Sequence, residues 1–140
     1  MENKQQDVLA TLELYKIRRD EAMREARQWF VTKFNPQSAM GIVQLLLSGE
    51  RESANYRMVT SYWEMAASFV NNGGIDEKLF LDANSEHIII FARMQPFIPE
   101  IRETIKEPDY LLNLETLVMK VPHAKEKIES RRRLLEKWTK

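Results

Sequence analysis

The segment from Tyr56 to Glu103 constrains the fold more than any other part of the chain. It reads YRMVTSYWEMAASFVNNGGIDEKLFLDANSEHIIIFARMQPFIPEIRE. The pattern predicts a long apolar helix that stops at Gly73-Gly74, because glycine favours the left-handed position after a helix. A short helix at 75–83 and a further helix follow, and Pro96 and Pro99 kink or end the latter because proline cannot continue a helix. The segment therefore indicates helical architecture.

The three consecutive isoleucines at 88–90 also fit a strand. No second segment with strand-like alternation is present to pair with them, so we interpret them as helical. The chain has 140 residues, of which 44% are hydrophobic and 30% charged, which is typical of one domain with one core. We therefore predict an all-α, single-domain bundle of five to seven helices spanning residues 1–140.

The first predicted element is one long helix over 6–34, which contains no glycine or proline and ends at Asn35-Pro36. Such a helix is about 42 Å long, whereas a compact chain of this size is roughly 37 Å across. We therefore expect it to overhang the domain and to present an apolar seam to a partner. The predicted dimer seam consists of Val8, Leu12, Tyr15, Ala22 and Trp29.

The rest of the chain is predicted to form central core helices over 36–106 and a helical pair over 108–140. The pair starts at Pro108, since proline is favoured at the first helical position. Residues 120–140 carry 8 basic and 3 acidic side chains, whereas residues 41–119 carry 6 and 12. The basic final helix, with Arg131, Arg132 and Arg133 as a contact patch, is a candidate for binding phosphate or an acidic partner, or for forming a solvated face.

Glu64 and His87 are the polar residues that stand out within the apolar helices. Glu64 lies on the narrow polar strip of its helix, as a carboxylate with a raised pKa or as an ion-pair partner of Arg57, Arg93 or Arg102. His87 follows Glu86, but residue 84 is Asn, so the Glu-x-x-His pattern of di-iron bundles is missing. We expect no metal site.

Several other classes of chemistry lack their sequence signatures. The chain has no cysteine, which excludes disulfides and thiolate sites and fits a reducing compartment. Neither of the glycine-rich phosphate-binding motifs occurs. No apolar stretch of about 18 residues and no signal peptide is present. We therefore expect a cytoplasmic protein without a transmembrane segment and without a cofactor.

The segment 56–103 resembles a bacterial all-helical family known only as a domain of unknown function. The residues that carry the resemblance are Trp63-Glu64, Gly73-Gly74, Ile75-Asp76, Pro96 or Pro99, and Arg102, together with the weaker N-terminal match RRDEAMREARQWFVTKFNP. The resemblance implies that many relatives carry a transmembrane helix ahead of that N-terminal segment, and we expect none in this chain. The resemblance implies a fold and no reaction.

The leading hypothesis is a soluble, non-catalytic helical module that acts through protein–protein association, including homodimerisation. One alternative is a nucleic-acid-associated regulator that uses the basic C-terminal helix. Another is a small-ligand binder or enzyme with a pocket near Trp63, Glu64 and His87, and with Arg93 and Arg102 as further polar candidates.

Overall fold

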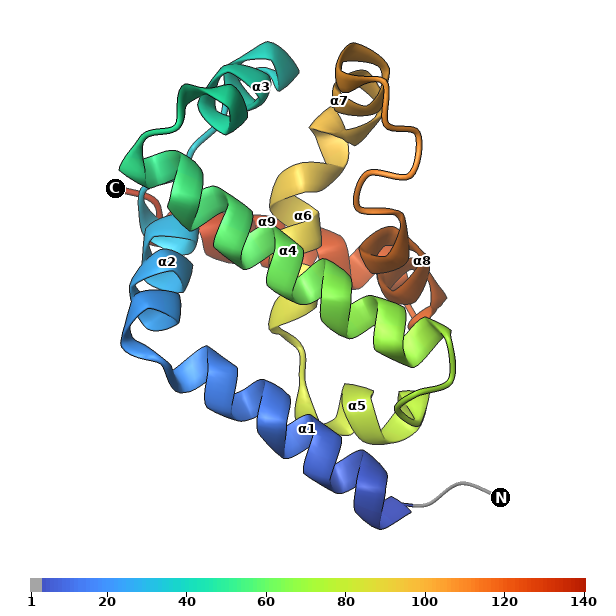
Figure 1. Ribbon diagram of the computed structural model, residues 1–140. Coiled ribbons are helices and arrows are strands. Elements are labelled where there is room, and N and C mark those ends of the chain that lie inside the picture. The colour runs from blue at the N-terminus through green and yellow to red at the C-terminus, as the bar shows by residue number, and fades with distance from the viewer. Residues whose placement is uncertain (1–3) are drawn as a thin grey trace.

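The computed structural model describes residues 4–140, which form an all-α domain, as predicted (Figure 1). Within this range there is no strand, and the isoleucines at 88–90 are helical. The described residues form nine α-helices and one 3-10 turn, more than the five to seven expected. In chain order they are α1 (Lys4–Arg19), α2 (Glu21–Thr32), α3 (Ala39–Ser48), α4 (Arg51–Asn71), α5 (Glu77–Ala83), α6 (Glu86–Met94), η1 (Gln95–Phe97), α7 (Ile98–Ile105), α8 (Leu112–Lys120) and α9 (Ala124–Trp138).

Helix α4 runs through the middle of the molecule and packs against α2 and α8, while α6 packs against α9 behind it (Figure 1). The buried positions of α4 recur every three or four residues, which is the spacing of one helix face. They include Tyr56, Val59, Trp63, Ala66 and Val70, each at most 5% exposed. The predicted stop is confirmed, since Gly73 has a φ of 81°. The centre of the core is thus the helix in which Glu64 lies.

The prediction of a single helix over 6–34 is wrong, because the chain leaves the helical conformation at Asp20. Asp20 has a ψ of 141°, and its carboxylate accepts a hydrogen bond from Ala22 N. Aspartate is a preferred residue at the start of a helix. At the end of α1, Arg27 Nη1 donates to Arg18 O at 3.1 Å, which satisfies one of the carbonyls left free there. The helix therefore does not overhang the domain.

The prolines after α6 end that helix, and the chain continues into a further helix. Helix α6 ends at Met94, the turn η1 contains Pro96, and α7 begins at Ile98 with Pro99 in its first turn. Proline is tolerated there because the first amide groups of a helix have no intrahelical acceptor. The segment thus continues as α7, which packs against α3.

The prediction that a helix starts at Pro108 is also wrong, since residues 108–111 form turns and α8 starts at Leu112. Leu111, directly before it, has a φ of 57°, and a residue in that left-handed conformation interrupts a helix. The predicted break at Val121-Pro122 separates α8 from α9. Among residues 4–140, no helix combines the length and the apolar composition needed to cross a membrane.

Candidate functional site

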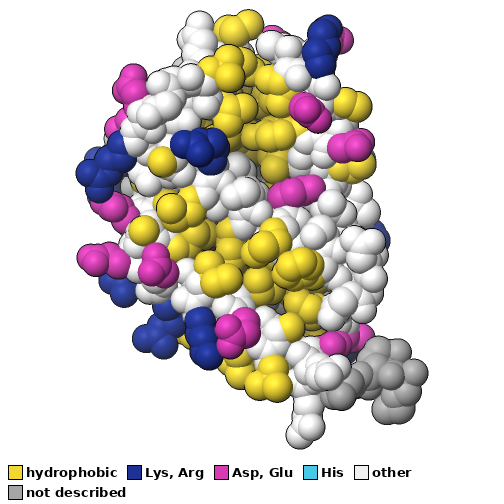
Figure 2. Space-filling model, viewed as in Figure 1, with side chains coloured by type: hydrophobic (Ala, Val, Ile, Leu, Met, Phe, Trp, Pro, Cys, Tyr) yellow, Lys and Arg dark blue, Asp and Glu magenta, His cyan; other side chains and the backbone are white. Residues whose placement is uncertain are grey.

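Helices α1 and α4 carry several large apolar side chains that are exposed to solvent. Figure 2 shows apolar atoms gathered over these two helices, with charged groups around them. Single exposed apolar residues are ordinary, whereas a contiguous group of them marks an interaction site. The members, each between 36% and 61% exposed, are Val8, Leu9, Leu12, Tyr15 and Ile17 on α1 and Met58, Met65 and Phe69 on α4. We call this set the α1–α4 face.

A groove of about 730 Å³ lies between the two helices of this face. Its apolar walls include Ile17 from α1, Met23 from α2, and Met58 and Met65 from α4, and Tyr62 also lines it. Methionine side chains are flexible and polarisable, so they adapt to the shape of an inserted apolar group. The rest of the lining consists of Ser61 and three charged residues of both signs, Glu13, Lys16 and Asp20.

Helix α1 is fastened to the domain mainly by polar contacts. Only Asp7 and Leu14 of α1 are buried. Tyr62 Oη donates to Leu14 O at 2.6 Å, and the Asp7 carboxylate accepts from Asp76 N at 2.9 Å. Burial raises the pKa of Tyr62 to about 12, so its hydroxyl stays a donor at neutral pH. A few specific bonds thus orient the inner side of α1, and all of its large apolar residues except Leu14 remain exposed.

The five residues of the predicted seam do not lie on one continuous surface. Val8, Leu12 and Tyr15 share the exposed side of α1. Ala22 lies beyond the break and lines a separate polar groove of about 1030 Å³ beside α2. Trp29 is half-buried and stacks on Phe34 with ring centroids 5.1 Å apart. The structure therefore keeps the α1 half of the seam together and separates the α2 half from it.

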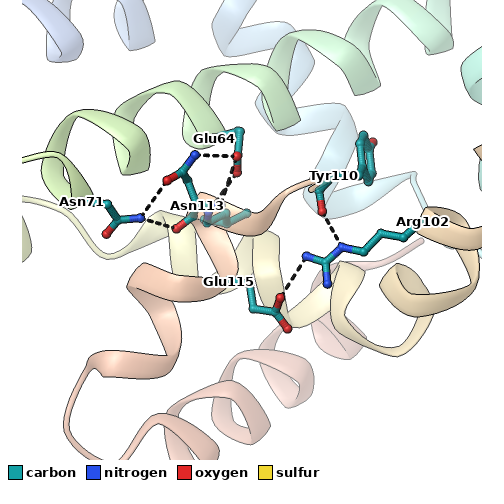
Figure 3. Close-up of polar contacts among 7 residues, drawn as sticks. Glu64, Asn71, Arg102, Tyr110, Asn113 and Glu115 are labelled. Carbon is teal, nitrogen blue, oxygen red and sulfur yellow. Dashed lines mark hydrogen bonds and ion pairs between the residues drawn. The ribbon is translucent and has the colours of Figure 1, made fainter. Parts of the chain in front are cut away.

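Glu64 holds the start of α8 (Figure 3). Its carboxylate accepts hydrogen bonds from Asn113 N at 3.1 Å, from Asn113 Nδ2 at 3.1 Å and from Leu114 N at 2.9 Å. The first amide groups of a helix lack intrahelical acceptors, and a negative charge there interacts favourably with the helix dipole. Asn71 Nδ2 donates to Asn113 O at 3.0 Å. Glu64 thus joins α4 to α8, and its acceptor capacity is used by backbone and amide groups instead of the three arginines considered above.

Arg102 fastens the loop between α7 and α8 (Figure 3). Its Nε donates to Tyr110 O at 2.8 Å, and its Nη2 bonds Glu115 Oε1 at 2.9 Å. The hydroxyls of Tyr110 and Tyr56 lie 2.5 Å apart, and burial raises the pKa of both phenols. Glu64 and Arg102 therefore bind the same part of the chain through different partners. Arg102 binds the loop before α8 and a residue in its first turn, and Glu64 binds the first amide groups of α8.

His87 is a core residue with no exposed surface. Its ring lies 5.8 Å from the Trp63 ring and 5.5 Å from the Phe80 ring, centroid to centroid. Neither ring nitrogen has a hydrogen-bond partner among residues 4–140. Burial lowers the pKa of His87 to about 4, and the Arg131 charge adds to this effect. His87 is therefore neutral at pH 7. Since Trp63 is buried too, these two residues and Glu64 do not share one open pocket.

The remaining cationic candidates are dispersed. Arg93 Nη2 donates to Thr139 Oγ1 at 2.9 Å. Arg131 and Arg132 are half-buried on either side of the inward face of α9, and only Arg133 is exposed. Arg132 bonds Gln95 Oε1, Glu129 Oε1 and Ala92 O. The three consecutive arginines thus do not form one surface patch.

Among residues 4–140, no group of three or more histidine or acidic side chains has an arrangement that could hold a metal ion.

Sequence reasoning missed the polar pairs that join distant segments. Asp7 binds the backbone next to α5, and Arg27 forms two bonds of 2.7 Å to the Glu86 carboxylate, which join α2 to α6. The Glu86 hydrogen bond raises the pKa of Arg27. These partners are 59 to 69 residues apart, so no local spacing indicates them. The one local signal was Asp7 itself, an acidic residue in a first helical turn.

Residues 5–121 match the family described as a domain of unknown function, DUF4760. Since the match covers most of the chain, the chain belongs to this family, and the resemblance to an uncharacterised domain family is confirmed. Searches of the curated proteins and of the solved structures each found no match.

Proposed function

We propose that this member of a family of unknown function is a non-catalytic module that acts through protein association, and that it forms a homodimer through the α1–α4 face. The observation that carries the proposal is the exposure of large apolar side chains on the two helices that border the groove, among them Leu12 on α1 and Met58 and Met65 on α4. Burial of apolar surface is the main driving force of most protein association.

A second copy of the chain fits this face because the face contains both a groove and a helix able to enter one. The exposed row Val8, Leu12, Tyr15 follows the spacing with which an amphipathic helix binds an apolar groove. In a two-fold dimer the same patch occurs on both subunits, so α1 of each copy can lie along the groove of the other. Homodimer interfaces are also more apolar than transient ones, which agrees with the walls of this groove.

The charged residues on the rim are compatible with such an arrangement. Lys16 and Glu13 are largely exposed and form an ion pair 3.0 Å long within α1. Exposed pairs of this kind contribute little to stability, so both groups are available to pair across a two-fold axis. Opposite charges on one patch avoid the like-charge contacts that oppose self-association.

The test is solution mass by light scattering over a range of protein concentrations. The proposal expects twice the chain mass of 16.6 kDa for the wild type, and the monomer mass for Leu12→Glu and for Met65→Glu. Leu12 is about half exposed and does not line the groove, so Leu12→Glu should change the stability of the subunit by less than about 0.5 kcal/mol.

Leu47→Glu is the matched control. Among residues 4–140, Leu47 is the most exposed large apolar residue, at 76%, and it lies on α3, outside the α1–α4 face. Leu47→Glu makes the same chemical change as Leu12→Glu outside the proposed interface, so this variant should keep the mass of the wild type. A wild type that stays monomeric at hundreds of micromolar, or a Leu12→Glu variant that keeps the dimer mass, would refute the proposed dimer.

A further inference from the structure

A small pocket of about 230 Å³ lies where α6, η1 and α9 meet the segment before α3. Its volume is below the roughly 300 Å³ at which pockets for drug-sized ligands begin, so it suits a small molecule. Most of its walls are apolar. The lining residues with apolar side chains are Pro36, Ala92, Pro96, Phe97 and Leu135, and those with polar side chains are Asn35, Arg93, Arg132 and Glu136.

Arg93 is a half-buried arginine with which no carboxylate among residues 4–140 pairs; the half-buried Arg18 and Arg131 share this feature but do not line the pocket. Arg27 and Arg102 bind Glu86 and Glu115 through ion pairs of 2.7 and 2.9 Å. Arg93, in contrast, donates only to the neutral Thr139 hydroxyl, at 2.9 Å. Its Nε is buried and has no partner within the described part of the chain.

Burial lowers the pKa of Arg93, and no nearby acid raises it. A half-buried charge without an opposite charge is unfavourable unless an anion accompanies it. Arg132, on the same pocket, is different because its guanidinium is already engaged by Glu129, Gln95 and the Ala92 carbonyl. Arg93 is thus the cation of this pocket that still has donors to offer.

We propose that the pocket binds a small organic monocarboxylate, with the planar Arg93 guanidinium holding the carboxylate and the proline, phenylalanine and leucine walls covering its apolar part. Arginine pairs with a carboxylate through two parallel hydrogen bonds, which gives direction as well as affinity. Glu136 also lines the pocket and repels any anion there, so a ligand with one negative charge is favoured over one with two. The apolar walls favour a carbon body over a fully hydrated inorganic ion such as phosphate.

Benzoate is the probe for this proposal, because it combines one carboxylate with one small apolar ring. Isothermal titration of the full chain is expected to detect benzoate binding, and neither benzamide, the neutral analogue, nor inorganic phosphate should bind measurably. Saturable binding of benzamide equal to that of benzoate, or binding of phosphate without benzoate, would refute the carboxylate site.

Arg93→Met should weaken benzoate binding by about tenfold or more, since a hydrogen-bonded charge is lost. Arg93→Lys keeps the charge but not the planar fork, so a smaller loss is expected; it also serves if the methionine variant does not fold. Arg133→Met, an equal charge change at an exposed position of α9, is the control and should bind as the wild type does. Unchanged binding by both Arg93 variants would show that the site lies elsewhere and overturn the proposal.

Discussion

Stability should fall as the pH is lowered through the range in which His87 takes up a proton on unfolding. Burial lowers the pKa of His87 from its usual 6.5 to about 4, and Arg131 acts in the same direction, while Glu86 partly opposes both. Between these two values the unfolded chain binds a proton that the folded chain does not. The contribution of His87 is therefore fully present above pH 6.5 and is lost as the pH falls.

The size of the effect follows from the difference between the two pKa values. Each unit is equivalent to about 1.4 kcal/mol, so the full loss below pH 4 is about 3 kcal/mol. Between pH 7 and pH 5 the expected loss is about 2 kcal/mol. This loss is a large share of the free energy of unfolding of a typical domain, which is roughly 5–15 kcal/mol.

The assay is urea denaturation of the wild type and of His87→Phe at several pH values from 7 to 4. Phenylalanine fits an aromatic site between Trp63 and Phe80 and does not titrate. Carboxylates that titrate in the same range contribute equally to both proteins, so the difference between the two curves reports His87. His123→Asn is the control, because His123 is exposed and asparagine accepts its φ of 58°. Parallel curves for wild type and His87→Phe would refute the reasoning.

Two further predictions concern the start of α8 and the end of α4, and both are measured by urea denaturation. Glu64→Ala removes the acceptor of three hydrogen bonds from Asn113 and Leu114, so the free energy of unfolding should fall by about 1–3 kcal/mol. Glu103→Ala, at an exposed position of α7, should leave it nearly unchanged, and equal effects would contradict the capping role. Gly73→Ala should cost about 1–2 kcal/mol, because alanine is strained at the φ of 81°; an unchanged stability would show that the turn relaxes.

The helical architecture was predictable because it depends on local patterns. The apolar period of α4, the glycines after it and the prolines at 96, 99 and 122 each act within one or two turns. The break at Asp20 was missed because aspartate is tolerated within a helix as well as at its start. Two hydrogen bonds stabilise the break, one from Arg27 to the Arg18 carbonyl and one from Ala22 N to the Asp20 carboxylate. The bond from Arg27 forms only when α1 and α2 pack together, and the apolar period does not specify that packing.

The polar residues were harder to interpret because their roles depend on partners far along the chain. Glu64 was predicted to lie on a polar strip, but its partners, Asn113 and Leu114, lie 49 and 50 residues away in the sequence. The same reasoning placed His87 among acidic neighbours in sequence, whereas its contacts in space are two aromatic rings. Sequence spacing shows which residues share a helix face, and only the packing of helices shows what that face meets.

Charged side chains that already bind a partner within the domain are not free to bind another molecule. Asp7, Arg27, Glu64 and Arg102 each bind a partner on another segment, so they orient helices and are not free for a ligand. Arg93 and the α1–α4 face differ, because the charge of the one and the apolar surface of the other are unmatched within residues 4–140. The two lie on different helices, with α6 and α9 behind α4 (Figure 1). The proposed carboxylate site and the proposed dimer therefore depend on separate observations, and the failure of one would leave the other intact.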